Sequence, residues 1–302
     1  MPFPTAVEIC DVGPRDGLQN EKMPVAAAAK IELVRLLQDA GLKHIEVTSF
    51  VSRKWVPQMA DAAQVMAGIE RRPDVRYSVL TPNLQGVTAA LASHPDEVVV
   101  FPACSETFSK RNLNCSIAES MERFAPAVAA ARGAGLSVRG ALSCGLGCPY
   151  EGEVSPEQVA AVARMLKEIG VDNCVLCDTI GVGTATVAQR AMEAVLKHFA
   201  LDHVAGHFHD TYGQALSNTL ACLEMGVWQY DTSVAGLGGC PFAKGATGNV
   251  ATEELVYLLH GMDIDTGIDL DRLIDAGAYI SGVLGRRSNS RVATAMLAKR
   301  QA

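Results

Sequence analysis

The 302-residue sequence is poor in charged and aromatic residues, which make up 20% and 5% of the chain. Its formal net charge of −7 argues against a broad basic surface, so we expect no binding to nucleic acid or to anionic membranes. No apolar run reaches the roughly 18 residues that a membrane span requires. Only residues 1–6 precede the first predicted strand, which leaves no room for a signal or transit peptide. We therefore expect a cytoplasmic protein.

A disulfide framework and a dinucleotide-binding motif are also missing. The nine cysteines are an odd number dispersed over a long chain, which is typical of reduced thiols in a cytosol. Cys174 and Cys177 would face opposite sides of a strand, and Cys144 and Cys148 flank a glycine-rich loop, so we expect neither pair to be a zinc or redox site. No G-x-G-x-x-G motif opens a helix after the first strand, which disfavours an open dinucleotide-binding sheet.

Short apolar segments alternate with amphipathic helical segments along the whole chain. Eight such β-then-α units without a linker predict an α/β fold, the (β/α)8 TIM barrel. We expect a single catalytic domain over residues 1–302, with the barrel over about 5–240. A glycine-rich loop and extra C-terminal helices, over about 236–302, are expected to cover one barrel face. Predicted strands lie near 7–12, 44–48, 76–80, 97–101, 137–142, 173–178, 204–209 and 230–235. Predicted helices lie near 25–40, 57–69, 84–93, 117–134, 156–169, 184–199, 213–225, 253–261, 270–284 and 292–298.

Two histidines stand two residues apart at the end of the seventh predicted strand. Side chains alternate between the faces of a strand, so His207 and His209 point the same way. Active sites of such barrels lie at the C-terminal ends of the strands, where Asp16, after the adjacent first strand, is the natural carboxylate ligand. Two imidazoles and a carboxylate, completed by an amide oxygen and water, favour Mg²⁺ or Mn²⁺, although imidazole also suits Zn²⁺.

Further reactive side chains are predicted at the same end of the barrel. We expect Arg15 to be a fixed cation that meets an oxyanion. Glu46 and Asp178 would be costly to bury unpaired, so we expect them to bond Arg15, a metal-bound water or a substrate hydroxyl. Cys240 lies among five glycines between positions 236 and 248, and a thiol on so flexible a loop can close over a substrate and transfer a proton.

These segments together resemble the 3-hydroxy-3-methylglutaryl-CoA lyase family. The run DVGPRDGLQNE, from Asp11 to Glu21, is similar to that family's first-strand motif, and SVAGLGGCPF, residues 233–242, to the signature around its reactive cysteine. Segments 143–152, 178–183 and 206–216 are similar as well, and the resemblance covers essentially the whole chain. Related barrels that make isopropylmalate or homocitrate usually carry a D-x-T-x-R-D segment, whereas Gly13-Pro14 occupies its middle here, as in the lyases.

The resemblance implies a carbon–carbon lyase that cleaves 3-hydroxy-3-methylglutaryl-CoA to acetoacetate and acetyl-CoA, a reaction of leucine breakdown. It implies an acyl-CoA substrate, a divalent cation (Mg²⁺ or Mn²⁺) and a homodimer or larger homo-oligomer. It implies metal ligation by Asp16, His207, His209 and Asn249. It implies that Arg15 binds the thioester carbonyl, that Cys240 is the catalytic thiol, and that Glu46, Asp178 and Thr179 line the active site. Asp16 and His207 are candidates for the base that takes the hydroxyl proton.

Three other functions stay open on the sequence alone. The chain could cleave a longer analogue, of the isohexenyl type, or it could be an acyl-CoA-dependent Claisen synthase that runs in the opposite direction. It could also be a metal-binding barrel without catalysis, although an inert scaffold has no use for a thiol on a glycine-rich loop.

Overall fold

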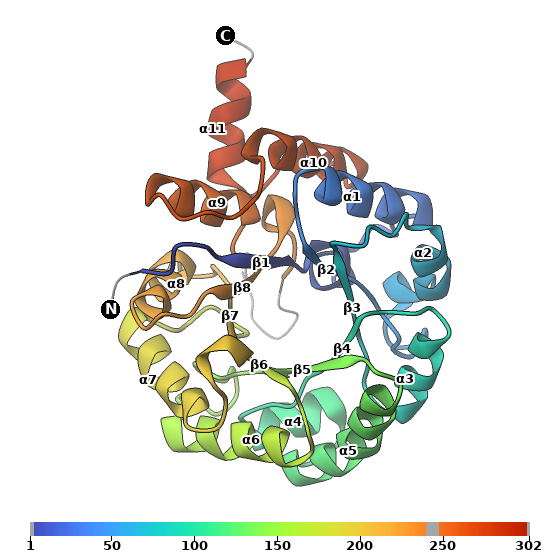
Figure 1. Cartoon of the computed structure of the whole chain (residues 1–302), viewed down its shortest axis with the longest axis vertical. Coiled ribbons are helices and arrows are strands. Elements are labelled where there is room, and N and C mark those ends of the chain that lie inside the picture. The colour runs from blue at the N-terminus through green and yellow to red at the C-terminus, as the bar shows by residue number, and fades with distance from the viewer. Residues whose placement is uncertain (1–2, 240–247, 301–302) are drawn as a thin grey trace.

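The computed structural model describes residues 3–239 and 248–300, and it contains a closed barrel of eight parallel strands. Neighbours in the chain are neighbours in the sheet, and β8 pairs with β1 to close the ring seen in Figure 1. The predicted TIM barrel is therefore confirmed. The strands are β1 (Glu8–Asp11), β2 (His44–Ser49), β3 (Arg76–Leu80), β4 (Glu97–Val100), β5 (Ser137–Leu142), β6 (Asn173–Asp178), β7 (Val204–Phe208) and β8 (Gln229–Thr232).

Helices surround the ring of strands (Figure 1). Those between the strands are α1 (Ala27–Asp39), α2 (Ala62–Gly68), α3 (Leu84–Leu91), α4 (Glu106–Leu113), α5 (Ile117–Gly133), α6 (Pro156–Glu168), α7 (Ala185–Leu196) and α8 (Ala215–Leu223). The periodicity of the sequence does not predict α4, because this polar helix buries only Phe108 and Ser109. Its start is fixed instead by Ser105, whose hydroxyl accepts the N–H of Phe108 at 3.1 Å.

The apolar core lies between the strands and the helices. It is one continuous cluster in which residues such as Leu33, Phe124, Leu166 and Leu255 are fully or almost fully buried. The apolar cluster inside the barrel is much smaller: it contains Val175, Cys177 and Ala205 on β6 and β7, with Ala141 beside them. Inside the barrel, the remaining space is therefore open to polar side chains, and several charged ones are buried there.

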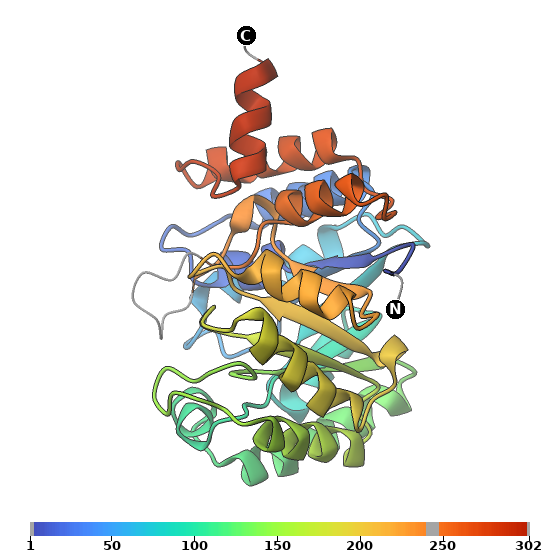
Figure 2. The same ribbon diagram turned by 90° about the vertical axis from the view of Figure 1, so that its left-hand side faces the viewer.

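The C-terminal extension packs against one side of the barrel. Helices α9 (Thr252–Gly261) and α10 (Leu270–Val283) lie beside β8 and β1, and α10 packs on α1 (Figure 1). Helices α9 and α10 complete the outer ring of helices. They therefore cover a side wall of the barrel and not one of its two ends (Figures 1 and 2). Helix α11 (Arg291–Arg300) contacts α9 and α10 and extends away from the barrel (Figures 1 and 2).

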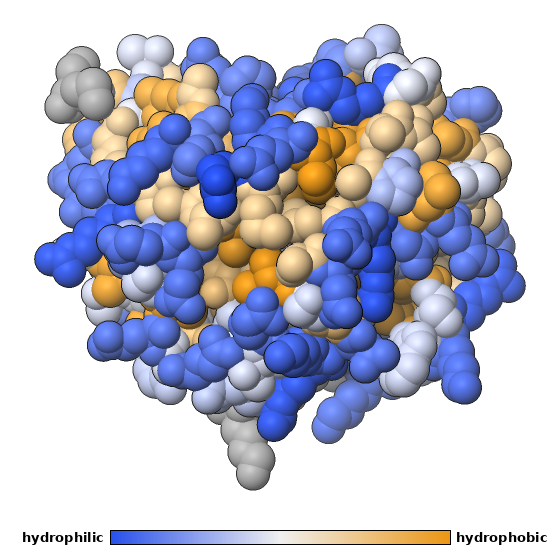
Figure 3. All heavy atoms as spheres, turned by 90° about the horizontal axis from the view of Figure 1, so that it is seen from below, coloured by the Kyte–Doolittle hydropathy of each residue, from blue (hydrophilic) through white to orange (hydrophobic). Residues whose placement is uncertain are grey.

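The surface of the described residues is mixed in character. On the side over α4, α5 and α6, hydrophilic side chains alternate with small apolar areas (Figure 3). Within 3–239 and 248–300, no helix has both the length and the apolar character that crossing a membrane requires.

Candidate metal and substrate site

A tight turn after β1 places Arg15 and Asp16 at the mouth of the barrel. Residues Gly13–Gly17 form a single π-helical turn, η1, in which the carbonyl of Val12 accepts the N–H groups of Asp16 (2.7 Å) and Gly17 (3.1 Å). A Cβ on Gly13 would lie 2.7 Å from a carboxylate oxygen of Asp11. A Cβ on Gly17 would lie 2.7 Å from the Cβ of Leu237. The two glycines of the GPRDG segment are therefore needed for this close packing.

Arg15 bridges two carboxylates. One guanidinium nitrogen lies 2.7 Å from Oδ1 of Asp16, and the other lies 2.8 Å from Oε2 of Glu46 on β2. The predicted contact between Glu46 and Arg15 is thus present. Within the described residues, Arg15 Nε and Glu46 Oε1 are buried without a hydrogen-bond partner, so both can still bind a polar group of a ligand.

The charges of this bridge follow from burial and from the nearby cations. Burial raises the pKa of Asp16, but the charge of Arg15 and the interactions with the two adjacent imidazoles outweigh it and hold that pKa well below its usual range. Burial also raises the pKa of Glu46, and here the opposing charge of Arg15 does not fully compensate. Asp16 is therefore the firmly ionised member of the pair.

His207 and His209 converge on Asp16 as the sequence predicts, but the expectation that the first strand is adjacent to the seventh is wrong, because β8 lies between β7 and β1. The centroids of the two imidazole rings lie 5.4 Å apart, and Nε2 of His209 is 4.0 Å from Oδ2 of Asp16. One ligand atom from each of the three residues falls within 4.8 Å of the others. Burial and the neighbouring His207 lower the pKa of His209 to about 4, so its imidazole is neutral, the form that binds metals.

Asn249 completes a set of donors that fits a divalent cation. Its amide nitrogen donates to Oδ2 of Asp16 at 2.8 Å and to the carbonyl of Leu237 at 3.2 Å. Its Oδ1 and the Nδ1 of His209 are buried and have no hydrogen-bond partner among the described residues. A buried amide oxygen that lacks a donor beside an ionised carboxylate and two imidazoles is a suitable ligand for a hard or borderline cation.

The side chains of Asp178 and Thr179 accept hydrogen bonds from nearby backbone N–H groups. The carboxylate of Asp178 accepts the N–H groups of Val182 (3.1 Å) and Gly183 (2.8 Å), and the hydroxyl of Thr179 accepts the N–H of Cys144 (2.8 Å). Burial raises the pKa of Asp178 to about 6. These bonds shape the loop after β6, and a direct contact of either side chain with substrate stays a prediction. Cys240 lies outside the described residues.

Sequence reasoning missed two charged residues directly below the metal-ligand candidates. Asp231 on β8 lies 3.2 Å from Nδ1 of His207, and Arg139 on β5 lies 2.8 Å from the other carboxylate oxygen of Asp231. The signal that could have found Asp231 is strand alternation. Tyr230 is buried toward the helices, where its hydroxyl donates to the carbonyl of Val227, so the next residue must point into the barrel.

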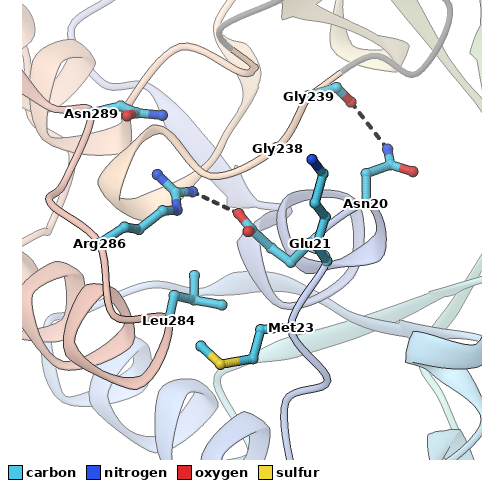
Figure 4. Close-up of a pocket in the computed structure, with 9 residues that line it drawn as sticks. Asn20, Glu21, Met23, Gly238, Gly239, Leu284, Arg286 and Asn289 are labelled. Atoms are coloured by element: carbon cyan, nitrogen blue, oxygen red, sulfur yellow. Dashed lines mark hydrogen bonds and ion pairs between the residues drawn. The ribbon is translucent and has the colours of Figure 1, made fainter.

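A pocket of about 520 Å³ opens beside the loop that carries Gly238 and Gly239 (Figure 4). It lies between the segment after η1 and the segment after α10. Arg286 reaches across it to Glu21 at 2.7 Å, and Asn20 donates to the carbonyl of Gly239 at 3.0 Å. Its lining consists of Asn20, Glu21, Lys22, Met23, Gly238, Gly239, Leu284, Arg286 and Asn289.

Comparison with known proteins gives consistent matches over nearly the whole chain. The model of the HMGL-like family matches residues 6–280. A 3-hydroxy-3-isohexenylglutaryl-CoA/hydroxymethylglutaryl-CoA lyase of Pseudomonas aeruginosa is 58% identical over 299 residues, covering 99% of this chain and all of the relative. A crystal structure of hydroxymethylglutaryl-CoA lyase from the same species superposes with a TM-score of 0.97 at 57% identity, covering 99% of this chain and 100% of that one.

A more distant relative was solved with ligands bound. The structure of an HMG-CoA lyase from Acinetobacter baumannii in complex with coenzyme A and 3-methylmalate has a TM-score of 0.93 at 35% identity and covers 98% of this chain and 96% of that one. With a family model over most of its length and relatives of such high identity, the chain belongs to the HMG-CoA lyase family of carbon–carbon lyases.

Proposed function

We propose that this protein cleaves 3-hydroxy-3-methylglutaryl-CoA to acetoacetate and acetyl-CoA with the help of a divalent cation. The observation that carries the proposal is the convergence of Arg15 with Asp16, His207 and His209 at one end of the barrel. It combines a fixed cation with a metal-ligand set, and both can stabilise the charges that develop when a β-hydroxy thioester is cleaved. The family membership of the chain supports the same reaction.

The proposed ligands of the cation are Asp16, His207, His209 and Asn249, and we propose Mg²⁺ or Mn²⁺ because oxygen donors make up half of this set. Such a cation, when bound, lowers the pKa of a coordinated hydroxyl and fixes the orientation of the substrate.

Arg15 is proposed to stabilise the charge that develops during cleavage. When the C2–C3 bond breaks, its electron pair moves into the thioester, which becomes an enolate, while the C3 hydroxyl loses its proton and becomes the ketone of acetoacetate. Glu46 and Asp16 hold the guanidinium of Arg15 in place, and its Nε has no other partner among the described residues. A pre-positioned cation of this kind stabilises an oxyanion more than it stabilises the neutral carbonyl.

Two proton transfers complete the proposed reaction. The hydroxyl proton passes to a base, for which Asp16 and His207 are the candidates. The enolate of acetyl-CoA then receives a proton, and we propose the thiol of Cys240 as its donor. A Cys240→Ser variant should turn over more slowly and should lose sensitivity to thiol reagents while its fold persists.

We further propose that the pocket lined by Lys22 and Arg286 receives the coenzyme A arm of the substrate. Its cations suit phosphate groups, and it adjoins the turn that carries Arg15 and Asp16. The Acinetobacter baumannii relative was solved with coenzyme A bound. A cytoplasmic location, a dimeric or larger assembly, and a single catalytic domain over the whole chain are proposed with this function.

An assay of acetoacetate release tests the proposed function. The protein should release acetoacetate and acetyl-CoA in equal amounts, stop when a chelator removes the metal, and recover when Mg²⁺ or Mn²⁺ is restored. Unchanged turnover in excess chelator would contradict the role of the metal, and the absence of acetoacetate would contradict the reaction.

The longer substrate is the second candidate, because the Pseudomonas aeruginosa relative carries the isohexenyl name beside the methyl one. The ratio of kcat/KM for the two thioesters, measured under the same conditions, decides between them. A higher kcat/KM for the isohexenyl substrate would assign the protein to the longer one.

A further inference from the structure

A file of alternating charges runs through the barrel below the proposed metal site. It begins with His207, continues through Asp231 and Arg139, and reaches Glu97 and His44 deeper in the barrel. The distances are 3.2 Å from His207 Nδ1 to Asp231 Oδ2, 2.8 Å from Asp231 Oδ1 to Arg139, and 3.1 Å from Glu97 Oε1 to His44 Nε2. All five side chains are buried, so the barrel interior is stabilised here by paired charges in place of apolar packing.

Asp231 lies between His207 and Arg139 in this file. Each of its two carboxylate oxygens faces a different partner, one on β5 and one on β7, and the residue itself is on β8. The carboxylate is therefore anchored between the guanidinium of Arg139 and the imidazole of His207.

An ionised carboxylate at Nδ1 decides which nitrogen of His207 is protonated. The Nδ1–H donates to Asp231, which leaves Nε2 as the nitrogen that can ligate the metal once it carries no proton. His209 offers a contrast, because its Nδ1 is buried with no partner within the described part of the chain. His207 has a carboxylate at hydrogen-bonding distance from its Nδ1, whereas the carboxylate nearest to His209, that of Asp16, lies 4.0 Å from its Nε2.

We infer that Asp231 and Arg139 are positioning residues that prepare His207 to bind the metal before the metal arrives. Asp231 fixes the tautomer and the ring of His207, and Arg139 holds the carboxylate of Asp231 in place. Partners of this kind raise the basicity of a ligating imidazole, and their removal weakens metal binding. The inference rests on the proposed metal site, but the state of His207 in the metal-free protein tests it independently.

Asp231→Asn is the central variant, because asparagine keeps the shape of the side chain and removes its charge. We expect its affinity for Mn²⁺, measured by calorimetry on the full chain, to fall about 10- to 100-fold. In the metal-free wild type, at a pH high enough for the imidazole of His207 to be neutral, ¹⁵N spectra should show a single Nδ1–H tautomer, and Asp231→Asn should show a mixture of tautomers. The His207 signals are assigned by their disappearance in His207→Ala.

Arg76→Gln is the matched control. Arg76 lies near the far end of the same file, 3.4 Å from Glu8, and it is 40% exposed. This variant also removes a charge from the barrel, but it should bind Mn²⁺ within twofold of wild type and keep the His207 tautomer. An equal loss of affinity in Arg76→Gln would mean that any charge change weakens the site, and would overturn the specific role of Asp231.

Arg139→Lys keeps the inference testable if Asp231→Asn does not fold. It retains a cation next to Asp231 but loses the fixed guanidinium geometry, so we expect a smaller, several-fold loss of Mn²⁺ affinity. Wild-type affinity together with an unchanged tautomer in the folded variants would refute the inference. If the wild type itself binds no Mn²⁺, the proposed metal site fails, and the tautomer of His207 still decides whether Asp231 positions it.

Discussion

Two groups of buried carboxyls in this barrel behave in opposite ways. Inside the barrel, Asp16, Glu97 and Asp231 each have cations beside them, and although burial opposes ionisation, these cations lower all three pKa values. Behind β8, Asp11 and Glu253 are equally buried, and burial raises their pKa values to about 7 and about 8. Burial alone therefore does not decide the charge of a carboxyl. Nearby cations can outweigh burial, as they do at these three acids, whereas at Glu46 the charge of Arg15 does not fully compensate it.

The second group connects the segments on either side of the candidate site. Asp11 accepts the N–H groups of Gly13 (2.8 Å) and Val234 (2.9 Å) and the hydroxyl of Thr252 (2.7 Å). Glu253 accepts the N–H of Ala235 at 2.9 Å. These bonds tie the turn that carries Arg15 and Asp16 to the turn after β8. Charge is thus concentrated at the mouth and in the barrel, while the surrounding turns are held by carboxyls whose pKa values are raised.

The largest effect is expected from Arg15→Met, which removes the cation at the mouth of the barrel. We expect kcat for cleavage to fall about 10³-fold with a smaller change in KM, because the guanidinium acts mainly in the transition state. The coupled assay of acetoacetate release measures it. Arg15→Lys keeps the charge but cannot bridge both carboxylates, so its kcat should lie between those of the wild type and Arg15→Met. A kcat of Arg15→Met within tenfold of wild type would contradict the proposed role.

The next effect is expected from Arg139→Met, which leaves Asp231 buried without its cation. The free energy of unfolding should fall by about 3 kcal/mol, because an uncompensated buried charge is costly. Urea unfolding at neutral pH measures the change. Arg139→Lys should recover much of the loss, and a loss below about 1 kcal/mol in Arg139→Met would show that the paired charges of the interior contribute little.

The smallest effect, about 1 kcal/mol for each pH unit, concerns the way in which Glu253 makes the free energy of unfolding depend on pH. Its folded pKa of about 8 lies above the ordinary value of 4.5, so between these values the folded protein binds more protons than the unfolded chain. The free energy of unfolding should therefore decrease as the pH rises through this window. Glu253→Gln cannot titrate, so its stability should fall less steeply between pH 5 and pH 8, by about 1 kcal/mol per pH unit.

Stability curves of the wild type and of Glu253→Gln at several pH values measure this difference. Glu224→Gln, at an exposed position, is the control and should follow the wild type. Parallel curves for Glu253→Gln and wild type would show that Glu253 is ionised in the folded state, and the contrast between the two groups of carboxyls would then fail.

Much of the architecture could be read from local patterns. Capping boxes at Ser116 and Ser155, each with Glu or Gln three residues later in the sequence, begin α5 and α6. The helices of the C-terminal extension are present near their predicted ranges. Helix α4 could not be predicted in this way, since it lacks an apolar face. Local patterns thus locate an element when burial requires a periodic sequence.

The residues of the candidate site likewise include some that local patterns could predict and some that they could not. His207 and His209 could be predicted as neighbours because two-residue spacing on a strand fixes their common direction. Their approach to Asp16 follows from the closure of the ring, and the sequence suggests it only when the barrel is assumed. Asp231 and Arg139 carry no motif, and their pairing brings together β8 and β5, which are not adjacent in the barrel.

The sequence by itself determined the alternation of strands and helices, the family, and the side chains available at the strand ends, because these depend on spacing along the chain and on residue chemistry. Only the tertiary structure decided which buried acids have cations beside them. That outcome depends on which side chains of distant strands meet across the closed barrel, and the electrostatic energy of a buried group changes strongly over a few ångströms.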